Sequence, residues 1–134
     1  MKPNNLIHLG SRKNISPANI LMLKSDINYT IIYLNDGSKI MSSTTLGKIE
    51  KRLKDFQFFR PNRSTIFNLE FMADFENKAQ SGSYGKILLK NNEKIALSRR
   101  RSEAFFKIIQ WKNEFKIILP KIYLQWKLFL QKSS

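Results

Sequence analysis

The chain has 134 residues, 42% of them hydrophobic and 12% aromatic, a composition that suits one folded domain and excludes disorder throughout. It holds 24 Lys and Arg against 10 Asp and Glu, a formal net charge of +14, and no Cys, which excludes disulfides and thiolate metal sites. So large a positive charge attracts polyanions. Nucleic acid is therefore the leading partner, with an acidic protein, an anionic membrane surface or an inert basic surface as alternatives.

Neither a secretory signal nor a membrane-spanning segment is predicted. The N-terminal stretch MKPNNLIHLGSRKN has no apolar run of signal-peptide length. No stretch of about 18 apolar residues occurs in the chain, so no transmembrane helix is expected. We therefore expect a cytoplasmic protein.

Short strands separated by turns are predicted for the N-terminal third. Leu6–Leu9 is an apolar patch typical of a strand, and Ser16-Pro17 suits the start of a one-turn helix, with Ser as its cap. Ile20–Lys24 and Tyr29–Leu34 are rich in β-branched and aromatic residues, which favour strands. Ser25–Asn28 joins them as a polar link suited to a hairpin.

A second hairpin and a short helix are predicted next. Asn35–Gly37 is a strong tight-turn signal, and Lys39–Ser42 returns from it as a strand. Thr44 is a candidate N-cap for a helix over Thr45–Leu53, in which apolar residues fall on one face. Gly47 weakens this helix by about 1 kcal/mol relative to Ala.

Further strands follow this helix. Phe58-Phe59 and Ile66-Phe67 are apolar runs on either side of a bend, and Leu69–Phe75 is predicted as another strand. Lys86–Leu97 has the pattern of a hairpin, with Asn91-Asn92 at its tip.

The C-terminal third is predicted to be helical. Before the hairpin of Lys86–Leu97, residues 77–85, NKAQSGSYG, are predicted to form a flexible connection. From Ser102 the period becomes three and four, which predicts a helix; the recurring residues are Phe105, Ile108, Ile109, Lys112, Phe115 and Leu119. Pro120 should end or kink this helix, and Ile122–Leu130 is a second apolar and basic piece. The segment could pack on the sheet edge, form a dimer contact, or hold a membrane or a sensor protein.

No catalytic or metal-binding constellation is found in the sequence. His8 is the single histidine and lies beside apolar residues, where a structural or solvated role is usual. Carboxylates are few and scattered, and no nucleophile elbow, phosphate-cradling glycine loop or zincin helix occurs. We therefore predict that the protein is not an enzyme and takes no cofactor, metal or small-molecule substrate.

The basic residues are grouped where strands are predicted to end. Arg60 and Arg63 fall in one inter-strand bend, Arg99–Arg101 in another, and Asn28 with Tyr29 in a third. Arg donates two parallel hydrogen bonds to a phosphate or to the O6/N7 edge of guanine, and Asn pairs similarly with adenine. Taken alone, SRRRSE is more often a solvated face or a helix start, and Asn28-Tyr29 is most often turn chemistry.

Four segments, in order along the chain, resemble the LytTR-type DNA-binding domain of bacterial transcription regulators: ILMLKSDINYTIIYLNDGSKI, TTLGKIEKRL, FQFFRPNRSTIFNL and KIALSRRRSEAF. The resemblance runs from about Leu6 to Ile109. Its most specific piece is matched in register by Phe59, Arg60, Arg63, Ser64 and Asn68. Ser98-Arg99-Arg100 after an apolar strand, and Asn28-Tyr29 before TIIYL, are the other two matching pieces.

The chain also departs from the family pattern. Asn62 stands where the family usually has His, and Ala96 where Pro is common; Asn62 can form hydrogen bonds but cannot titrate. Most members carry a receiver or sensory domain upstream, and because none is expected here, control through a sensor or regulatory partner chain is anticipated. We expect a LytTR-type domain over residues 1–111 and a C-terminal helical extension over 112–134.

The resemblance implies an all-β, elongated fold of small antiparallel sheets with a short central helix. Loops projecting from these sheets would enter successive major grooves of double-stranded DNA, with tandem half-sites and a homodimer on DNA as typical features. By position, the residues implied to contact base edges are Asn28, Arg63 and Arg100. Those implied to contact phosphates or support the loops are Arg60, Asn62, Ser64, Arg99 and Arg101. A structural role within the bend is the alternative for Ser64 and Asn68.

The leading hypothesis is therefore a sequence-specific transcription regulator. The alternative is an interaction module that binds an acidic protein or an anionic membrane surface through its C-terminal amphipathic segment. RNA binding is less favoured, because the exposed-aromatic signature of an RNA-recognition sheet is not found. Placement of the arginines separates the hypotheses: in projecting loops they favour DNA, whereas basic residues on the C-terminal helix favour a membrane.

Overall fold

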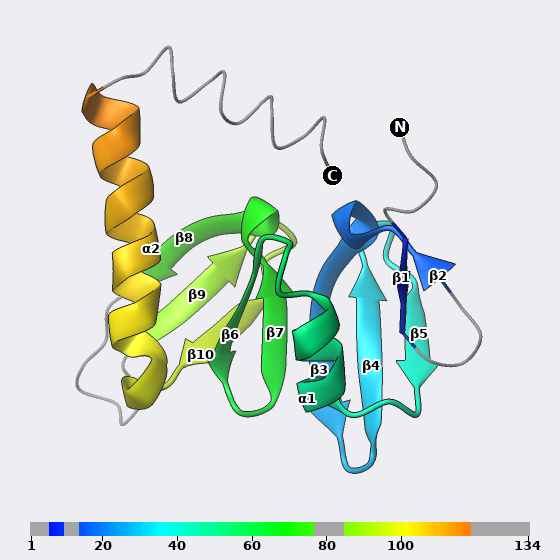
Figure 1. Ribbon diagram of the computed structural model, residues 1–134. Helices are drawn as coiled ribbons and strands as arrows, with labels where there is room; N and C mark the ends of the chain where they lie inside the picture. The colour runs from blue at the N-terminus through cyan, green and yellow to red at the C-terminus, as the bar shows by residue number, and fades with distance from the viewer. Residues whose placement is uncertain (1–5, 10–13, 77–84, 119–134) are drawn as a thin grey trace.

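The computed structural model describes residues 6–9, 14–76 and 85–118, with side chains described up to residue 110. Strands in small antiparallel sheets are the main elements of the described residues, and two α-helices accompany them, α1 (Leu46–Arg52) and α2 (Arg99–Ile118). The predicted all-β class with a short central helix is confirmed (Figure 1). The predictions for residues 77–84, Pro120 and Ile122–Leu130 lie outside the described residues.

A five-stranded antiparallel sheet forms the centre of the molecule. In spatial order its strands are β5 (Lys39–Ser42), β4 (Tyr29–Leu34), β3 (Ile20–Asp26), β7 (Thr65–Asn68) and β6 (Phe58–Asn62). β3 pairs with β4 as far as Asp26↔Tyr29, so only Ile27 and Asn28 remain in the turn between them. The central strand β3 therefore fixes the position of two neighbouring turns, because it also pairs with β7.

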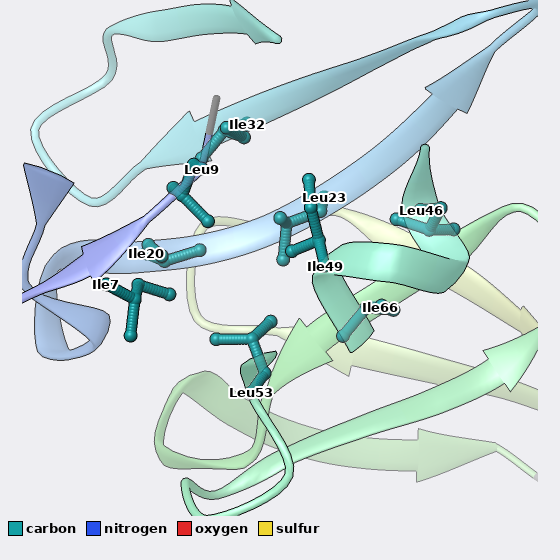
Figure 2. Close-up of a cluster of buried hydrophobic side chains, with 9 residues drawn as sticks. All are labelled: Ile7, Leu9, Ile20, Leu23, Ile32, Leu46, Ile49, Leu53 and Ile66. Carbon is teal, nitrogen blue, oxygen red and sulfur yellow. The ribbon is translucent and has the colours of Figure 1, made fainter. Parts of the chain in front are cut away.

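One face of this sheet is covered by α1 and by the small hairpin of β1 (Ile7–His8) and β2 (Asn14–Ile15). Figure 2 shows the buried cluster, in which Ile49 of α1 lies beside Leu23 of β3, and Leu53, the residue after α1, belongs to the same cluster. The helical spacing seen in the sequence places these apolar residues on the one face of α1 that packs against the sheet.

The opposite face of the sheet packs against a second, three-stranded sheet and α2. The order of this sheet is β10 (Lys94–Leu97), β9 (Gly85–Leu89) and β8 (Met72–Glu76). Phe105 of α2 is fully buried, with its ring centroid 5.7 Å from that of Phe59 in β6 and 5.0 Å from that of Phe75 in β8. The start of α2 is therefore fixed by the core (Figure 1).

Side chains alternate between the two faces except at a β-bulge in β3. Ile20 and Leu23 both belong to the cluster beneath α1, although a strict period of two would place residues three apart on opposite faces. Leu21 and Met22 both belong to the other cluster, and the β3–β4 register shifts between Ile20 and Met22. Because the bulge adds one residue to β3, Leu21 and Met22 both face the second cluster, and Leu23 returns to the face that α1 covers.

The boundaries of several elements differ from the sequence-based prediction. The one-turn 3₁₀ helix η2 (Pro17–Asn19) forms with Pro at its start, but Ser16 makes no side-chain cap bond. α1 begins at Leu46 with Thr45, and not Thr44, at the N-cap position.

The strand predicted over Leu69–Phe75 is also divided. Its first three residues form a 3₁₀ turn, η3 (Leu69–Phe71), and β8 begins at Met72. The cause is the buried Asn68, whose side chain accepts a hydrogen bond from the Glu70 N–H and caps the turn.

Candidate nucleic-acid interface

Three turns lie along the same edge of the molecule, the lower edge in Figure 1. They are the β3–β4 turn at Ile27-Asn28, the β6–β7 turn at Arg63-Ser64, and the start of α2 at Arg99. Backbone hydrogen bonds join neighbours: the Ser25 N–H donates to the Ser64 carbonyl at 2.9 Å, and the Ser98 N–H donates to the Pro61 carbonyl at 3.0 Å. We call this the turn edge.

Arg60 supports the β6–β7 turn from within. It lies in β6, not in the bend as the sequence suggested, because β6 continues to Asn62. Its guanidinium donates from Nη2 to the Arg63 carbonyl at 2.6 Å and forms an ion pair from Nη1 to Glu50 Oε1 at 2.9 Å. Arg60 therefore joins α1 to the turn that carries Arg63.

Asn62 bridges the β6–β7 turn to β10. Its Nδ2 donates to the Ala96 carbonyl at 2.6 Å, while its Oδ1 accepts from the Ser64 N–H at 2.9 Å and the Ser64 hydroxyl at 3.0 Å. The Oδ1 bonds form an Asx-type turn, which is a usual role for Asn at this position. The hydrogen-bonding groups of the Asn62 amide are thus engaged inside the protein.

Arg101 is also engaged inside the protein. Its Nε donates to the Arg60 carbonyl at 3.0 Å, and its guanidinium lies 5.0 Å from the centroid of the Phe59 ring. The Arg101 N–H donates to the carbonyl and the hydroxyl oxygen of Ser98, at 3.2 and 3.3 Å, which caps the helix.

The three arginines predicted in an inter-strand bend instead form the first turn of α2. The prediction of a bend was wrong, because the serine cap and the buried Phe105 begin the helix directly after β10. The first turn of α2 holds no acidic residue. Positive side chains at this end oppose the helix macrodipole, so the arrangement concentrates positive potential at a cost in helix stability.

Five of the eight predicted site residues are exposed: Asn28, Arg63, Ser64, Arg99 and Arg100. Ser64 is bonded to Asn62, whereas the side chains of the other four form no hydrogen bond or ion pair with the described part of the chain. Arg60, Asn62, Ser64 and Arg101 are bonded internally, as described above. The turn edge therefore combines internally bonded side chains with exposed donors that have no partner among the described residues.

Asn68, whose structural role was one alternative, is 3% exposed and lies in the core. Its Nδ2 donates to the Ile20 carbonyl at 3.0 Å, so it joins β7 to the start of β3. Two further residues, one in α1 that supports the turn edge and one within the turn edge, were missed by the sequence analysis. Glu50 carries no local signal because its partner Arg60 is on another element, and Ile27 was counted as part of a polar link.

Other kinds of site find little support in the described residues. No group of three or more His, Asp or Glu is placed to hold a metal ion in the segments 6–9, 14–76 and 85–118. Over the same segments, no helix is both long and apolar enough to cross a membrane.

Comparison with known proteins agrees with the fold. The family model of the LytTr DNA-binding domain matches residues 10–110, and the chain belongs to this family of DNA-binding domains. A solved structure with a similar fold is the LytTr DNA-binding domain of a Bacillus cereus protein described as a methyl-accepting/DNA response regulator. It shares 18% identity and a TM-score of 0.64, over 78% of this chain and 95% of that chain. A search of curated proteins found no match.

Proposed function

We propose that the protein is a transcription regulator that binds double-stranded DNA in a sequence-specific manner, with the turn edge in the major groove. Asn28, Arg63 and Arg100 contact base edges from three separate turns. The observation that carries this proposal is the division of the turn edge into residues with internal partners and exposed residues without them. Reading a base edge requires exposed hydrogen-bonding groups that the fold holds in fixed positions.

The exposed residues divide by their chemistry. Arg63 and Arg100 each offer a planar fork that matches the O6/N7 edge of guanine, and Asn28 offers an amide that matches the N6/N7 edge of adenine. Arg99 adjoins Arg100 in the first turn of α2 and serves as a phosphate contact, which sets the position of the helix without reading sequence.

The internally bonded residues act as loop supports. Arg60, Asn62 and Arg101 hold the backbone of the turn edge through hydrogen bonds to carbonyl groups. A side chain that reads a base must be held within a fraction of an ångström, which requires a supporting layer of this kind. Of the two roles implied for these residues by the family resemblance, phosphate contact or support, we assign them support.

Tandem half-sites and a homodimer on DNA complete the proposal. One turn edge spans a short stretch of duplex, and a two-fold or tandem arrangement of sites multiplies specificity through effective concentration. Regulation by a sensor or regulatory partner chain, and the absence of enzymatic activity, are part of the same proposal. The domain boundary at residues 111 and 112 also remains a prediction, and α2 runs through it to Ile118.

The test is a selection from random duplex DNA, followed by fluorescence anisotropy on the selected duplex and on a scrambled control at low and near-physiological salt. The proposal predicts a selected sequence with two similar half-sites about one helical turn apart, bound at the higher salt on the order of 10³-fold more tightly than the control. Equal binding to both duplexes, lost together as salt rises, would mean that only the net charge of +14 is felt. The basic interaction module would then be the better description.

A further inference from the structure

We propose that Ile27 is a specificity-determining residue, and that it contacts the C5-methyl group of a thymine beside the base read by Asn28. This inference rests on the proposed DNA-binding function and adds to it an apolar contact, which no basic or amide group can supply. Three observations carry the inference: the exposure of Ile27, its backbone conformation and its place on the turn edge.

Ile27 is the most exposed of the large hydrophobic side chains in the described segments. Its relative exposure is 93%, against 56% for Met41, 49% for Tyr29 and 46% for Leu6. It belongs to neither of the two buried clusters and packs against neither of them. An isoleucine so exposed contributes nothing to the hydrophobic stabilisation of the fold, since that stabilisation depends on apolar area removed from water.

The backbone conformation at Ile27 is energetically unfavourable for an isoleucine. Its φ is 55°, in the left-handed region that β-branched residues rarely occupy. In a two-residue hairpin turn with positive φ at the first central residue, Gly is strongly favoured at that position. Glycine at position 27 would therefore suit the fold better than isoleucine does. Strain retained at an exposed position is a reason to look for function there.

The position of Ile27 on the turn edge indicates which group of the DNA its side chain contacts. It precedes Asn28 in the β3–β4 turn, and this turn is joined to the Arg63 turn by the bond from the Ser25 N–H to the Ser64 carbonyl. In the major groove an A·T pair presents the adenine N6/N7 edge and, beside it, the thymine methyl group. An apolar side chain next to an amide is thus complementary to A·T, or to two neighbouring A·T pairs.

The test uses the duplex obtained by selection, with each thymine replaced in turn by deoxyuridine, which removes only the C5-methyl group. For the wild-type protein we expect one or two replacements to weaken binding about three- to fivefold, the loss expected for one buried methyl group. Ile27→Ala should weaken binding to the unmodified duplex by a similar factor. In this variant the same deoxyuridine replacements should have no effect, because the partner of the methyl group is gone.

Three controls complete the design. Ile27→Gly should bind like Ile27→Ala and should have an unchanged or higher melting temperature, because the strained side chain is removed. Leu6→Ala removes a partly exposed aliphatic side chain in the segment before β1 and should leave both affinity and the deoxyuridine effects unchanged. The slope of binding against salt should be the same in wild type and Ile27→Ala, since no phosphate contact is lost.

The inference is overturned if every deoxyuridine replacement affects wild type and Ile27→Ala equally, while the selected duplex still binds far more tightly than the scrambled one. Equal loss of affinity for both duplexes in Ile27→Ala would likewise overturn it, because the contact would then not depend on sequence. If wild type does not distinguish the two duplexes at all, the proposed function fails first, and this result is distinct from the other two.

Discussion

Arg60 of β6 donates a hydrogen bond from Nη2 to the carbonyl of Arg63 at 2.6 Å, so one of these two arginines holds the turn that presents the other. The same guanidinium is paired with Glu50 of α1 at 2.9 Å. Two residues that look equivalent in the sequence therefore have different environments, one bonded on two sides and the other open to solvent. The predictions below follow from that difference.

Replacing Arg60 should disturb Arg63 without removing a DNA contact. Arg60→Ala removes a charge-assisted hydrogen bond and a partly exposed ion pair, and should lower the free energy of unfolding by about 1–2 kcal/mol. Binding to the selected duplex should weaken while the salt slope stays unchanged, which anisotropy at several salt concentrations measures. Glu50→Gln is the matched control: it removes the ion pair but leaves the Arg63 carbonyl bonded, so its effects should be smaller. A salt slope reduced by about one in Arg60→Ala would instead identify a phosphate contact.

Replacing Asn62 should mainly cost stability. Asn62→Ala removes the side-chain partners of the Ala96 carbonyl and the Ser64 N–H, both exposed to water, and we expect a loss of about 0.5–1.5 kcal/mol in urea unfolding. Asn62→Asp keeps an acceptor for Ser64 but cannot donate to Ala96 from an ionised carboxylate, so it should fall between wild type and Asn62→Ala. Unchanged unfolding of Asn62→Ala would contradict the bridging role given to this side chain.

The sheet and its turns could be predicted from the sequence because local signals determine them. The tight turn at Asn35–Gly37 and the hairpin tip at Asn91-Asn92 are confirmed, since both depend on residues that tolerate turn conformations. Arg60 was placed wrongly because Pro61 is usual in a bend. Here Pro61 lies in an edge strand at an irregularity of the register between Phe59 and Asn62, where a missing N–H does no harm.

Candidate site residues could be named from the sequence, but not which of them are hydrogen-bonded inside the protein and which are exposed. Arg60 and Arg63 differ only through tertiary contacts, because Glu50 lies ten residues before Arg60 on another element. Arg99–Arg101 were assigned to a bend because the pattern of three and four was read only from Ser102 onward, although Ser98 was available as a cap. Ile27 gave no signal because φ and exposure are properties of the folded turn.

Gly85 and Gly47 should respond oppositely to the same substitution. A Cβ atom at Gly85 would lie 2.6 Å from the Glu76 carbonyl oxygen and 2.7 Å from the Phe75 ring, and a backbone oxygen in a β ladder cannot move aside cheaply. Gly85→Ala should therefore lower the melting temperature. A Cβ atom at Gly47 in α1 meets nothing within 4 Å, so Gly47→Ala should stabilise the protein by about 1 kcal/mol. Thermal unfolding of both variants checks this, and equal effects would contradict the packing described here.

Acidification should remove a small contribution to stability from the β4–β5 turn as the Asp36 carboxylate is protonated. Hydrogen bonds from the Ser38 hydroxyl, and then from the Ser38 N–H, hold the pKa of the exposed Asp36 carboxyl below its ordinary value of 3.8. A lowered folded-state pKa means that this contribution to stability is present above the ordinary pKa and is lost as the pH falls through the folded-state value. Ser38→Ala should raise the Asp36 pKa, as followed by NMR titration. An unchanged Asp36 titration in Ser38→Ala would show that the Ser38 hydroxyl does not hold this carboxylate.

The central claim is tested most directly by comparing Arg100→Ala with Arg99→Ala, two neighbouring exposed arginines in the same turn of α2. Fluorescence anisotropy on the selected and the scrambled duplex, over a range of salt, separates their roles. Arg100→Ala, like Arg63→Ala, should cost about 1–3 kcal/mol on the selected duplex and little on the scrambled one. Arg99→Ala should weaken both duplexes alike and reduce the salt slope by about one. Equal losses on both duplexes for Arg100→Ala and Arg63→Ala would contradict the claim that the turn edge reads sequence.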